Sequence, residues 1–450
     1  MRERRERAGR ADAVQYRRAI AQSHDCITHQ LVTGTNMGYQ QGLSGLAGAS
    51  SNLDVIGNNI ANANTVGFKQ GRANFADMYA NSVATSVNTQ IGIGTRLASV
   101  QQHFSQGTIN STKSSLDVAI NGNGFFQMSS NGVTTYSRDG TFHRDKNGAI
   151  VDAQGRNLMG YAAGAGGVIN TAQTVPLQAP TSNIAPRATN KITGQFNLNA
   201  QDKVPAKTPF NATDNTTYNY NTSIQVYDSL GGSQPVNLYF VKPAAGTWQA
   251  YAGAQGQTPT NLGTVTFDAS GRISSTTSAA TGQPTASLGQ FAFSIPNTTG
   301  GANPQNLTLD LGGTTQYGGK DGVNNLAQDG FASGTLTTFS IGTDGKLTGN
   351  YSNGQSAVLG LIALANFNNP NGLVNIGGNQ YAETAASGVP QISAPGSTNH
   401  GTLQGSALEN SNVNLTTELV NLITAQRNYQ ANAQTIKTQQ AVDQTLLNLR

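Results

Sequence analysis

The two ends of this 450-residue chain carry helical apolar patterns, and this feature most constrains its fold. From Gly405 to Arg450 the chain reads as helical, with apolar or small residues in steps of three, four or seven at Leu415, Leu419, Leu422, Tyr429, Ala433 and Ile436. The same spacing near the N-terminus joins Tyr39, Leu43, Leu46, Leu53, Ile56 and Ile60. Such spacing places apolar side chains on one helix face. We therefore predict paired N- and C-terminal α-helices that form a coiled-coil-like inner domain.

Neither helix is expected to be stable alone. The N-terminal helix contains Gly38, Gly42, Gly45, Gly48 and Gly57, and each glycine costs about 0.5–1 kcal/mol relative to Ala. Ordering one residue costs roughly 1–2 kcal/mol, whereas burying one large apolar side chain returns only roughly 1.5–3 kcal/mol. We infer helices that become ordered when other molecules cover both faces. The predicted assembly residues are Leu415, Leu419, Leu422, Tyr429 and Ile436.

The composition argues against several classes of function. The chain has 53 glycines and 11% charged residues, which favours turn-rich β-structure. Its net charge is +4, but residues 1–36 hold seven Arg and four acidic residues, so the remainder is almost neutral and no nucleic-acid binding is expected. The single cysteine, Cys26, cannot form an intramolecular disulfide or a Cys-rich metal site. No apolar run approaches the roughly 18–20 residues that span a bilayer, so no membrane insertion is predicted.

The middle of the chain reads as β-structure. Leu116, Val118 and Ile120 alternate with a period of two. Possible hairpin turns follow at Asn121-Gly122, Asn131-Gly132, Asp139-Gly140 and Asn147-Gly148. The same pattern returns at 336–354 and 359–367, so one β-domain is expected to consist of two separated segments. Between them, strands are expected at 223–227 and 236–241 on either side of a turn at 228–232.

These observations predict a multidomain, mainly β protein with paired terminal helices. Residues 1–36 form a basic extension. Residues 37–105 and 401–450 form the terminal helical domain and its connector. Residues 106–180 and 330–400 form the discontinuous β-domain, and residues 181–329 form an inserted outer β-domain.

At the end of the first helical pattern the sequence reads NNIANANTVGFK, from Asn58 to Lys69. It resembles the signature of the bacterial flagellar axial proteins, which comprise rod, hook and hook-associated proteins. The matching residues are Asn62, Ala63, Asn64, Thr65, Gly67, Phe68 and Lys69. The blocks LDVAINGNGFF, YSRDGTF and ALENSNVNLTTELVNLITAQRNYQANAQ extend the resemblance over most of the chain. The residue pattern agrees, because Asn, Gly and an aromatic after an apolar stripe indicate a helix stop and a turn.

The resemblance implies a structural subunit that polymerises with itself into the flagellar hook, the curved flexible tube between the basal-body rod and the filament. Its implied partners are the distal rod protein, the hook cap, the hook-filament junction proteins and the type III export apparatus that delivers it to the cell exterior. Within the family, the 150-residue insertion favours the hook type over the distal rod type. Hook-associated junction proteins share the ends but are typically longer. No enzyme activity, cofactor or metal is expected.

Residues 1–36 do not match the family, whose members usually begin a few residues before the first helix, where Met37 stands. We favour a misassigned start codon. An Arg-rich regulatory arm, a nucleic-acid contact and a disordered tail remain alternatives.

The sequence gives only weak indications of a catalytic, metal, nucleotide or cross-linking site. Asp139, His143 and Asp145 are close in sequence, yet they fall in a predicted turn, where Asp is favoured for backbone reasons. Gly122-x-Gly124 lacks the third glycine and the helix of a dinucleotide-binding motif. Some spirochaete members of the family are cross-linked between Cys and Lys, but Cys26 lies in the unmatched segment, so no cross-link is predicted. A secreted β-rich enzyme or adhesin is the competing hypothesis.

Overall fold

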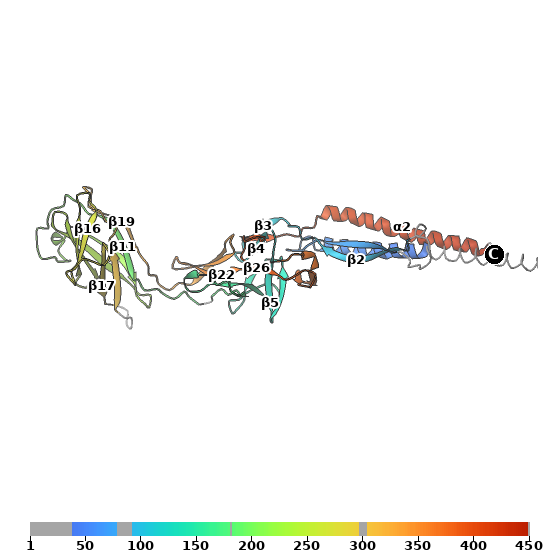
Figure 1. The fold of residues 1–450 in the computed structure, drawn as a ribbon, viewed down its shortest axis with the longest axis horizontal. Helices are drawn as coiled ribbons and strands as arrows, with labels where there is room; N and C mark the ends of the chain where they lie inside the picture. Colours follow the sequence, from blue (N-terminus) through green and yellow to red (C-terminus); the bar gives the residue numbers. More distant parts are fainter. Residues whose placement is uncertain (1–37, 79–91, 181, 297–303, 449–450) are drawn as a thin grey trace, which may run out of the picture. The chain divides into compact units, whose positions relative to one another are not determined.

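The computed structural model describes residues 38–78, 92–180, 182–296 and 304–448, as two compact units (Figure 1). Of these residues, the first unit contains those up to Ala179 together with Phe339–Thr348 and those from Val358 onward, and the second contains Pro180–Thr338 and Gly349–Ala357. The extension 1–36, with Cys26, and the predicted start at Met37 lie outside the described residues. The predicted division of the first unit into a helical and a β-domain stays a prediction.

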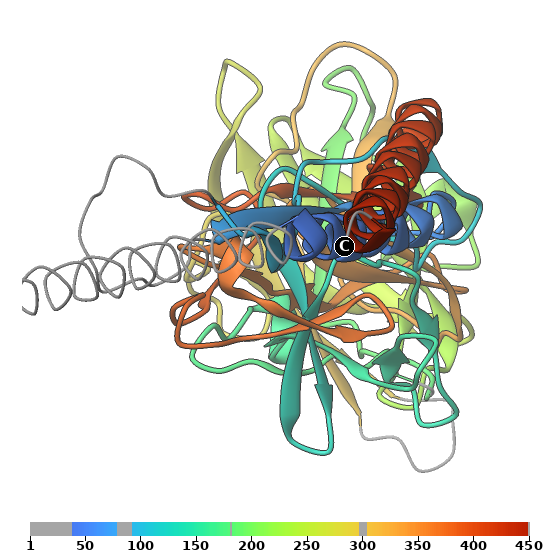
Figure 2. The same cartoon turned by 90° about the vertical axis from the view of Figure 1, so that its right-hand side faces the viewer.

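Two helices and a β-ribbon form one end of the first unit. One helix covers residues 38–61 of the described part, and α2 spans Leu415–Asn448. The ribbon pairs β1 (Gly71–Met78) with β2 (Gly94–Gln102) in antiparallel fashion, from Gly71 opposite Gln102 to Met78 opposite Gly94. Figure 2 shows helix 38–61 in blue beside α2 in red. The expected paired terminal helices are confirmed, and the connector predicted within residues 37–105 contains a paired ribbon.

The rest of the first unit contains one large sheet and two separate two-stranded sheets, and parts of β20, β21 and β22 are assigned to the second unit. The main path of the large sheet runs β20-β21-β22-β9-β5-β6-β25-β24. The elements are β3 (Ile109–Ser111), β4 (Val118–Asn121), β5 (Phe125–Ser130), β6 (Val133–Ser137), β7 (His143–Arg144), β8 (Ile150–Val151), β9 (Asn157–Ala162), η1 (Ala165–Gly167), β10 (Val175–Pro176), β20 (Leu336–Ile341), β21 (Lys346–Tyr351), β22 (Ser356–Ile362), β23 (Leu364–Asn366), η3 (Pro370–Gly372), β24 (Val374–Gly377), β25 (Gln380–Ala382), β26 (Gln391–Ser393), β27 (Thr402–Gly405) and β28 (Ala407–Glu409). Apolar side chains from both separated segments share its core, including Phe126 and Met128 from one and Ile362 and Leu364 from the other.

The C-terminal helix begins later than the sequence pattern predicted. Residues 405–414 are not helical, because β27 pairs with β4 and β28 pairs with β3, each in antiparallel fashion. Two of the four expected hairpin turns are also wrong. Asn131-Gly132 joins the paired strands β5 and β6, and Asn147-Gly148 joins β7 and β8. Asn121-Gly122 and Asp139-Gly140 close no hairpin, since β4 pairs with β27 and β6 pairs with β5 and β25.

The second unit is a β-sandwich. One sheet has the order β12-β13-β14-β15-β16 and the other β17-β18-β11-β19. The elements are β11 (Lys191–Asn197), η2 (Asn215–Thr217), β12 (Tyr220–Tyr227), β13 (Ser233–Ala244), β14 (Thr247–Ala254), β15 (Thr260–Phe267), β16 (Ile273–Ser278), β17 (Gln290–Ile295), β18 (Gln305–Asp310) and β19 (Gly322–Gln328). Phe196 and Leu309 from one sheet pack with Val236 and Trp248 from the other in a single core.

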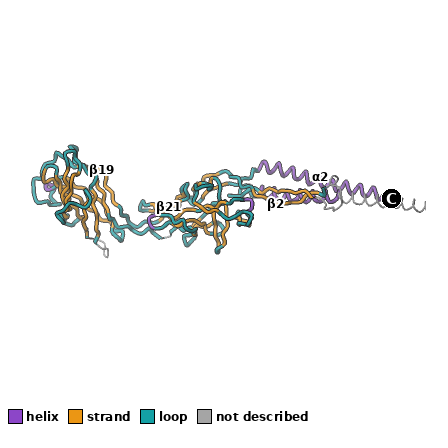
Figure 3. Tube along the Cα trace, in the orientation of Figure 1, coloured by secondary structure: helices purple, strands orange, loops and turns teal. Residues whose placement is uncertain are grey.

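The strands expected at 223–227 and 236–241 are confirmed as parts of β12 and β13, which pair across a turn. The turn is held by Asp228, whose Oδ1 accepts hydrogen bonds from the backbone N–H groups of Leu230 (2.9 Å) and Gly232 (2.8 Å). Figure 3 shows that strands and loops account for the described residues outside the two helices and short 3₁₀ turns. The fold is therefore mainly β with paired terminal helices, as predicted.

Candidate assembly site

The signature motif forms the turn that leaves helix 38–61. The Asn62 N–H donates to the carbonyl of Asn58 at 3.1 Å, and the Thr65 hydroxyl donates to the Asn62 side chain at 3.2 Å. Gly67 has φ of +69°, and a Cβ added there would lie 2.6 Å from the backbone nitrogen of Asp139. Glycine is required at this position, because the backbone is left-handed and another backbone passes against it.

The last motif residue, Lys69, lies in a buried ion cluster with Arg138 and Glu409. Lys69 Nζ is 2.7 Å from Glu409 Oε1, and Arg138 Nη1 is 3.3 Å from Glu409 Oε2. The three side chains are 0%, 4% and 0% exposed. Burial lowers the pKa of Lys69, while the Glu409 carboxylate opposes that shift. A buried pair of this kind must keep both partners, since one charge left alone in the interior is costly.

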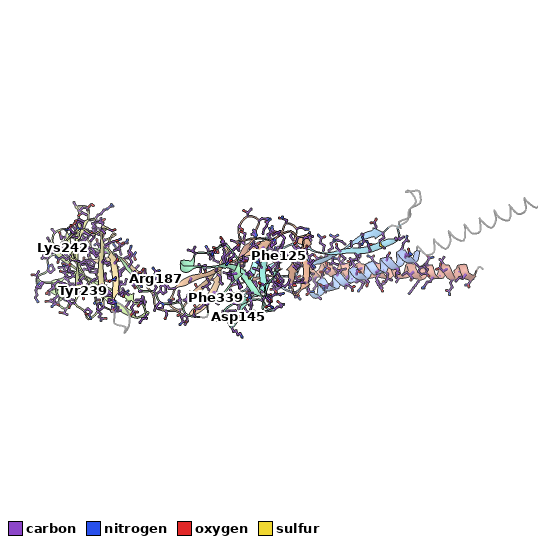
Figure 4. All side chains as sticks on the ribbon, turned by 60° about the horizontal axis from the view of Figure 1, so that its bottom comes forward. Phe125, Asp145, Arg187, Tyr239, Lys242 and Phe339 are labelled. Atoms are coloured by element: carbon purple, nitrogen blue, oxygen red, sulfur yellow. The ribbon has the colours of Figure 1, made fainter. Side chains whose placement is uncertain are left out.

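Neighbouring groups complete the ion cluster. Lys69 Nζ donates to the carbonyl of Ser105 at 2.8 Å, and Glu409 Oε1 accepts from the Gly107 N–H at 2.8 Å. The Arg138 guanidinium lies 5.3 Å from the ring centre of Phe125, which is labelled in Figure 4. The cluster thus joins the signature motif, the YSRDGTF block and the ALEN block, which are far apart in sequence.

A second polar contact joins the helices to the ribbon. The buried Asn59 exchanges two hydrogen bonds with the backbone of Gly71, at 2.8 and 2.9 Å. Glu418 in the first turn of α2 accepts from Asn59 (3.2 Å), Gln70 (2.7 Å) and Asn421 (3.2 Å). The start of α2 is thereby fixed against the end of helix 38–61 and the start of β1.

The structure gives the motif residues different environments. Gly67, Phe68 and Lys69 are buried, whereas Asn64 is exposed. The remaining members are half-buried: Asn62, Ala63 and Thr65. Sequence reasoning missed Asn59, Arg138, Glu409 and Glu418. Arg138 and Glu409 carried a signal, since each is a charged residue within a block that otherwise reads as strand and turn.

The two helices of the chain meet along a seam of small and polar residues. Added Cβ atoms at Gly38, Gly42 and Gly45 would lie 2.9 Å from Gln439 Oε1, 2.8 Å from Ile436 Cγ1 and 2.6 Å from Asn432 Oδ1. Apart from Ala433, the less exposed positions of α2 recur in steps of three, four or seven. We call these residues the intrachain seam: Glu418, Leu422, Ala425, Asn432, Ile436, Gln439 and Asp443. Close approach of the backbones accounts for the glycines that a helix disfavours.

Not all of the predicted assembly residues lie in this seam. Leu415 and Leu419 are 47% and 45% exposed and do not fill the contact between the two helices of one chain. Leu422 and Ile436 are half-buried in the seam, and Tyr429 is 37% exposed. The glycine-lined contact leaves no room for a row of leucines, which project instead from the neighbouring face. The role of the five residues in assembly stays a prediction.

The exposed apolar residues of α2 form a row beside the seam. Leu415, Leu419 and Ile423 follow one another at steps of four and are between 45% and 50% exposed. We call them the outer row. Further exposed apolar residues of the two helices are Leu43, Val420, Val442 and Leu447. Contiguous exposed apolar surface marks an interaction site.

A cavity of about 500 Å³ opens between helix 38–61, the ribbon and α2. Its walls include Asn52, Asn59, Arg72, Asn421 and Asn428, together with the buried carboxylate of Glu418. Its lining is rich in amides and small side chains. The two helices of one chain therefore do not cover each other completely.

No catalytic arrangement appears among Asp139, His143 and Asp145. The Asp139 carboxylate accepts from the N–H (3.0 Å) and hydroxyl (2.6 Å) of Thr141, and burial raises its pKa. Asp145 accepts from the N–H groups of Asn147 and Ala149 within its turn. Within the described ranges, no group of three or more His, Cys, Asp or Glu could hold a metal ion. Nor does any helix in the described part of the chain have the length and apolarity to cross a membrane.

Four protein-family models match the chain. They are "Flagella basal body rod protein" at residues 40–69, "Flagellar hook protein FlgE/F/G D1 domain" at 119–208, "Flagellar basal body protein FlaE D2 domain" at 197–331, and "Flagellar basal body rod FlgEFG protein C-terminal" at 404–449. The D2 match covers most of the β-sandwich.

Curated relatives match over nearly the whole chain. The flagellar hook protein FlgE of Salmonella typhimurium is 42% identical over 425 residues, covering 92% of this chain and 100% of the relative. The chain belongs to the flagellar hook protein family. FlgE of Escherichia coli is 41% identical over 425 residues (92% and 100%), and FlgE of Treponema pallidum is 33% identical over 458 residues (91% and 98%).

A member of the hook protein family is a structural subunit of the flagellar hook at the basal body. The preference for the hook type over the rod type, which rested on the inserted domain, is confirmed by these relatives and by the D2 match. The ion cluster and the intrachain seam are therefore structural contacts within a hook subunit, and the role of the exposed residues in assembly stays a prediction.

Proposed function

We propose that the chain polymerises with copies of itself through its terminal helices. The observation that carries this proposal is the outer row of α2. Its intrachain seam mixes apolar and polar side chains, such as Leu422 and Asn432, while Leu415, Leu419 and Ile423 face outward. Exposed leucines at helical spacing favour contact with another protein surface. In a homopolymer that surface belongs to a second copy.

The proposal extends to the partners that a hook tube requires. The tube joins the distal rod protein at one end and the hook-filament junction proteins at the other, and a hook cap covers its growing tip. The subunit reaches the cell exterior through the type III export apparatus, and it acts by structure rather than by catalysis. Loss of the protein from the culture medium in a strain without that apparatus tests the export step.

The neutral surface of α2 supports a flexible joint. A hook bends during each revolution, so neighbouring subunits must exchange contacts as they slide. Asn421, Gln426, Asn428 and Gln434 are exposed amides, and amide hydrogen bonds exchange with those of water at little net cost. Buried ion pairs fixed across the same interface would be harder to exchange.

Negative-stain electron microscopy of the purified chain tests the proposal. The expected result is curved tubes that form above a critical concentration. A chain that stays monomeric in sedimentation at every concentration and salt condition would contradict polymerisation. The β-sandwich offers an internal control, because Trp248, the single tryptophan, is fully buried in its core and reports its folding by fluorescence.

A further inference from the structure

Glu418 is a buried carboxylate whose hydrogen bonds all come from amides. It is 2% exposed and accepts one bond each from Asn59, Gln70 and Asn421. A carboxylate has about four acceptor sites, so the three bonds leave capacity on the side of the cavity that Glu418 lines. Across the described ranges, no ion pair involves Glu418. Arg72 and His103 also line the cavity, but neither forms an ion pair with Glu418, whose charge is met by amides alone.

Arg427 is the complementary group on the same helix. It is exposed, and among the described residues it takes part in no ion pair. It lies nine residues after Glu418, which at 3.6 residues per turn is about 180° around the helix and ~13.5 Å along it. Arg427 therefore points away from the cavity of its own chain and cannot reach its own Glu418.

We infer that Arg427 of one copy enters the Glu418 cavity of a second copy. The inference rests on the proposed self-assembly and names the contact that drives it. Arginine suits this place because its planar guanidinium matches a carboxylate and also donates to amide oxygens. The asparagines that line the cavity, Asn52 and Asn428 among them, supply such oxygens. The cavity of about 500 Å³ has room for an arginine side chain.

The placement of the two groups also sets the form of the assembly. An acceptor on one face of α2 and a donor on the opposite face make a heterologous, head-to-tail contact. Such contacts extend into rings or open helical filaments, whereas a symmetric contact stops at a dimer. A tube is built from contacts that extend.

Chemical cross-linking tests the contact in the full-length chain. An arginine that reaches a carboxylate through a cavity keeps the two Cα atoms farther apart than the roughly 7 Å that a disulfide can bridge, so a short bis-maleimide reagent joins the two cysteines instead. In a Cys26→Ser background, the pair Glu418→Cys and Arg427→Cys is assembled, treated with this reagent and run on a denaturing gel. Positions 418 and 427 of one copy lie ~13.5 Å apart along α2 and on opposite faces of it, so the cross-links join two copies. The expected result is a ladder of dimers, trimers and higher species. The matched control, Glu418→Cys with Lys437→Cys, uses the other cation of α2 and should give no ladder.

If the cysteine variants do not assemble, the critical concentration for tubes is measured with glutamine variants instead. Glu418→Gln and Arg427→Gln should each raise the critical concentration for tubes by about tenfold or more, and the double variant should do no worse than either single one. The effects of Lys437→Gln and Glu418→Gln on the critical concentration should instead be additive. Arg72 also lines the cavity, so Arg72→Gln is included.

Three outcomes would overturn the contact. The first is normal tubes from the cysteine variant without a ladder, and the second is a gel that stops at dimers. The third is that the effects of Glu418→Gln and Arg427→Gln on the critical concentration add up, whereas those of Glu418→Gln and Arg72→Gln do not. In each case the wild-type chain still forms tubes and the proposed function stands. Failure of the wild-type chain to form tubes would instead contradict the proposed function.

Discussion

Lys69 and Glu409 lie 340 residues apart in the chain, and their side chains form a 2.7 Å ion pair with no exposed surface on either partner. Glu409 belongs to β28, only a few residues before α2 begins, and Lys69 follows helix 38–61. The ion cluster thus ties both terminal helices to the β-sheet of the first unit. Movement of the helices relative to the sheet is restricted at this point.

Lys69→Met should destabilise the first unit by about 3–5 kcal/mol, because it leaves Glu409 buried and paired only with Arg138 at 3.3 Å. Urea unfolding followed by near-ultraviolet circular dichroism of the tyrosines measures the effect. Lys346→Met is the matched control. Its ion pair with Asp344 is about half exposed on both sides, so at most about 1 kcal/mol is expected. Equal effects of the two variants would show that the buried pair has no special role.

The helix glycines should separate into two kinds. Nothing lies within 4 Å of a Cβ added at Gly57, so Gly57→Ala should stabilise the helix of the monomer by about 0.5–1 kcal/mol. Gly42→Ala should weaken helix pairing, because its Cβ would lie 2.8 Å from Ile436 Cγ1. The helical signal in circular dichroism and the rate of limited proteolysis are measured for the monomers of both variants. Equal protection of the terminal helices by Gly42→Ala and Gly57→Ala would contradict the close helix contact at Gly42.

The carboxyl of Asp214 provides a test by pH. The Thr216 hydroxyl, the Thr216 N–H and the Lys207 ammonium hydrogen-bond to it, and they lower its pKa from 3.8 to about 2. Because the folded-state pKa is the lower one, the contribution to stability is complete above 3.8 and is lost as the pH falls through about 2. Carboxyl titration by NMR should give a midpoint near 2, and Thr216→Val should raise it. A midpoint near 3.8 in the unmodified chain would contradict the hydrogen-bonded turn.

Several elements could be predicted because their signals are local. The spacing of apolar residues predicted both helices, and alternation with a strong turn at Asp228 predicted β12 and β13. The signature motif indicated the turn at Gly67. In each case the determining residues are within about ten positions of one another.

The rest depends on partners that local patterns do not identify. The ALEN block forms β28 rather than helix because it pairs with β3. Local patterns do not reveal this pairing, since β3 lies about 300 residues away in the chain. Asn121-Gly122 has the chemistry of a hairpin turn, yet β4 pairs with β27. Leu419 illustrates the limit most clearly. Helical spacing shows that this residue lies on an apolar face, but not whether the surface opposite belongs to the same chain or to another copy.

If the outward face of α2 joins subunits, Leu419→Asp should block the formation of tubes. Leu419 is 45% exposed in the single chain, so a charge there leaves the β-units folded but is costly once a neighbour covers it. Gln434→Ala, also on α2 and exposed, is the control and should form tubes almost normally. Electron microscopy scores the tubes and circular dichroism scores the fold. The expected result is folded Leu419→Asp protein without tubes. Normal tubes from that variant would show that this face of α2 does not join subunits.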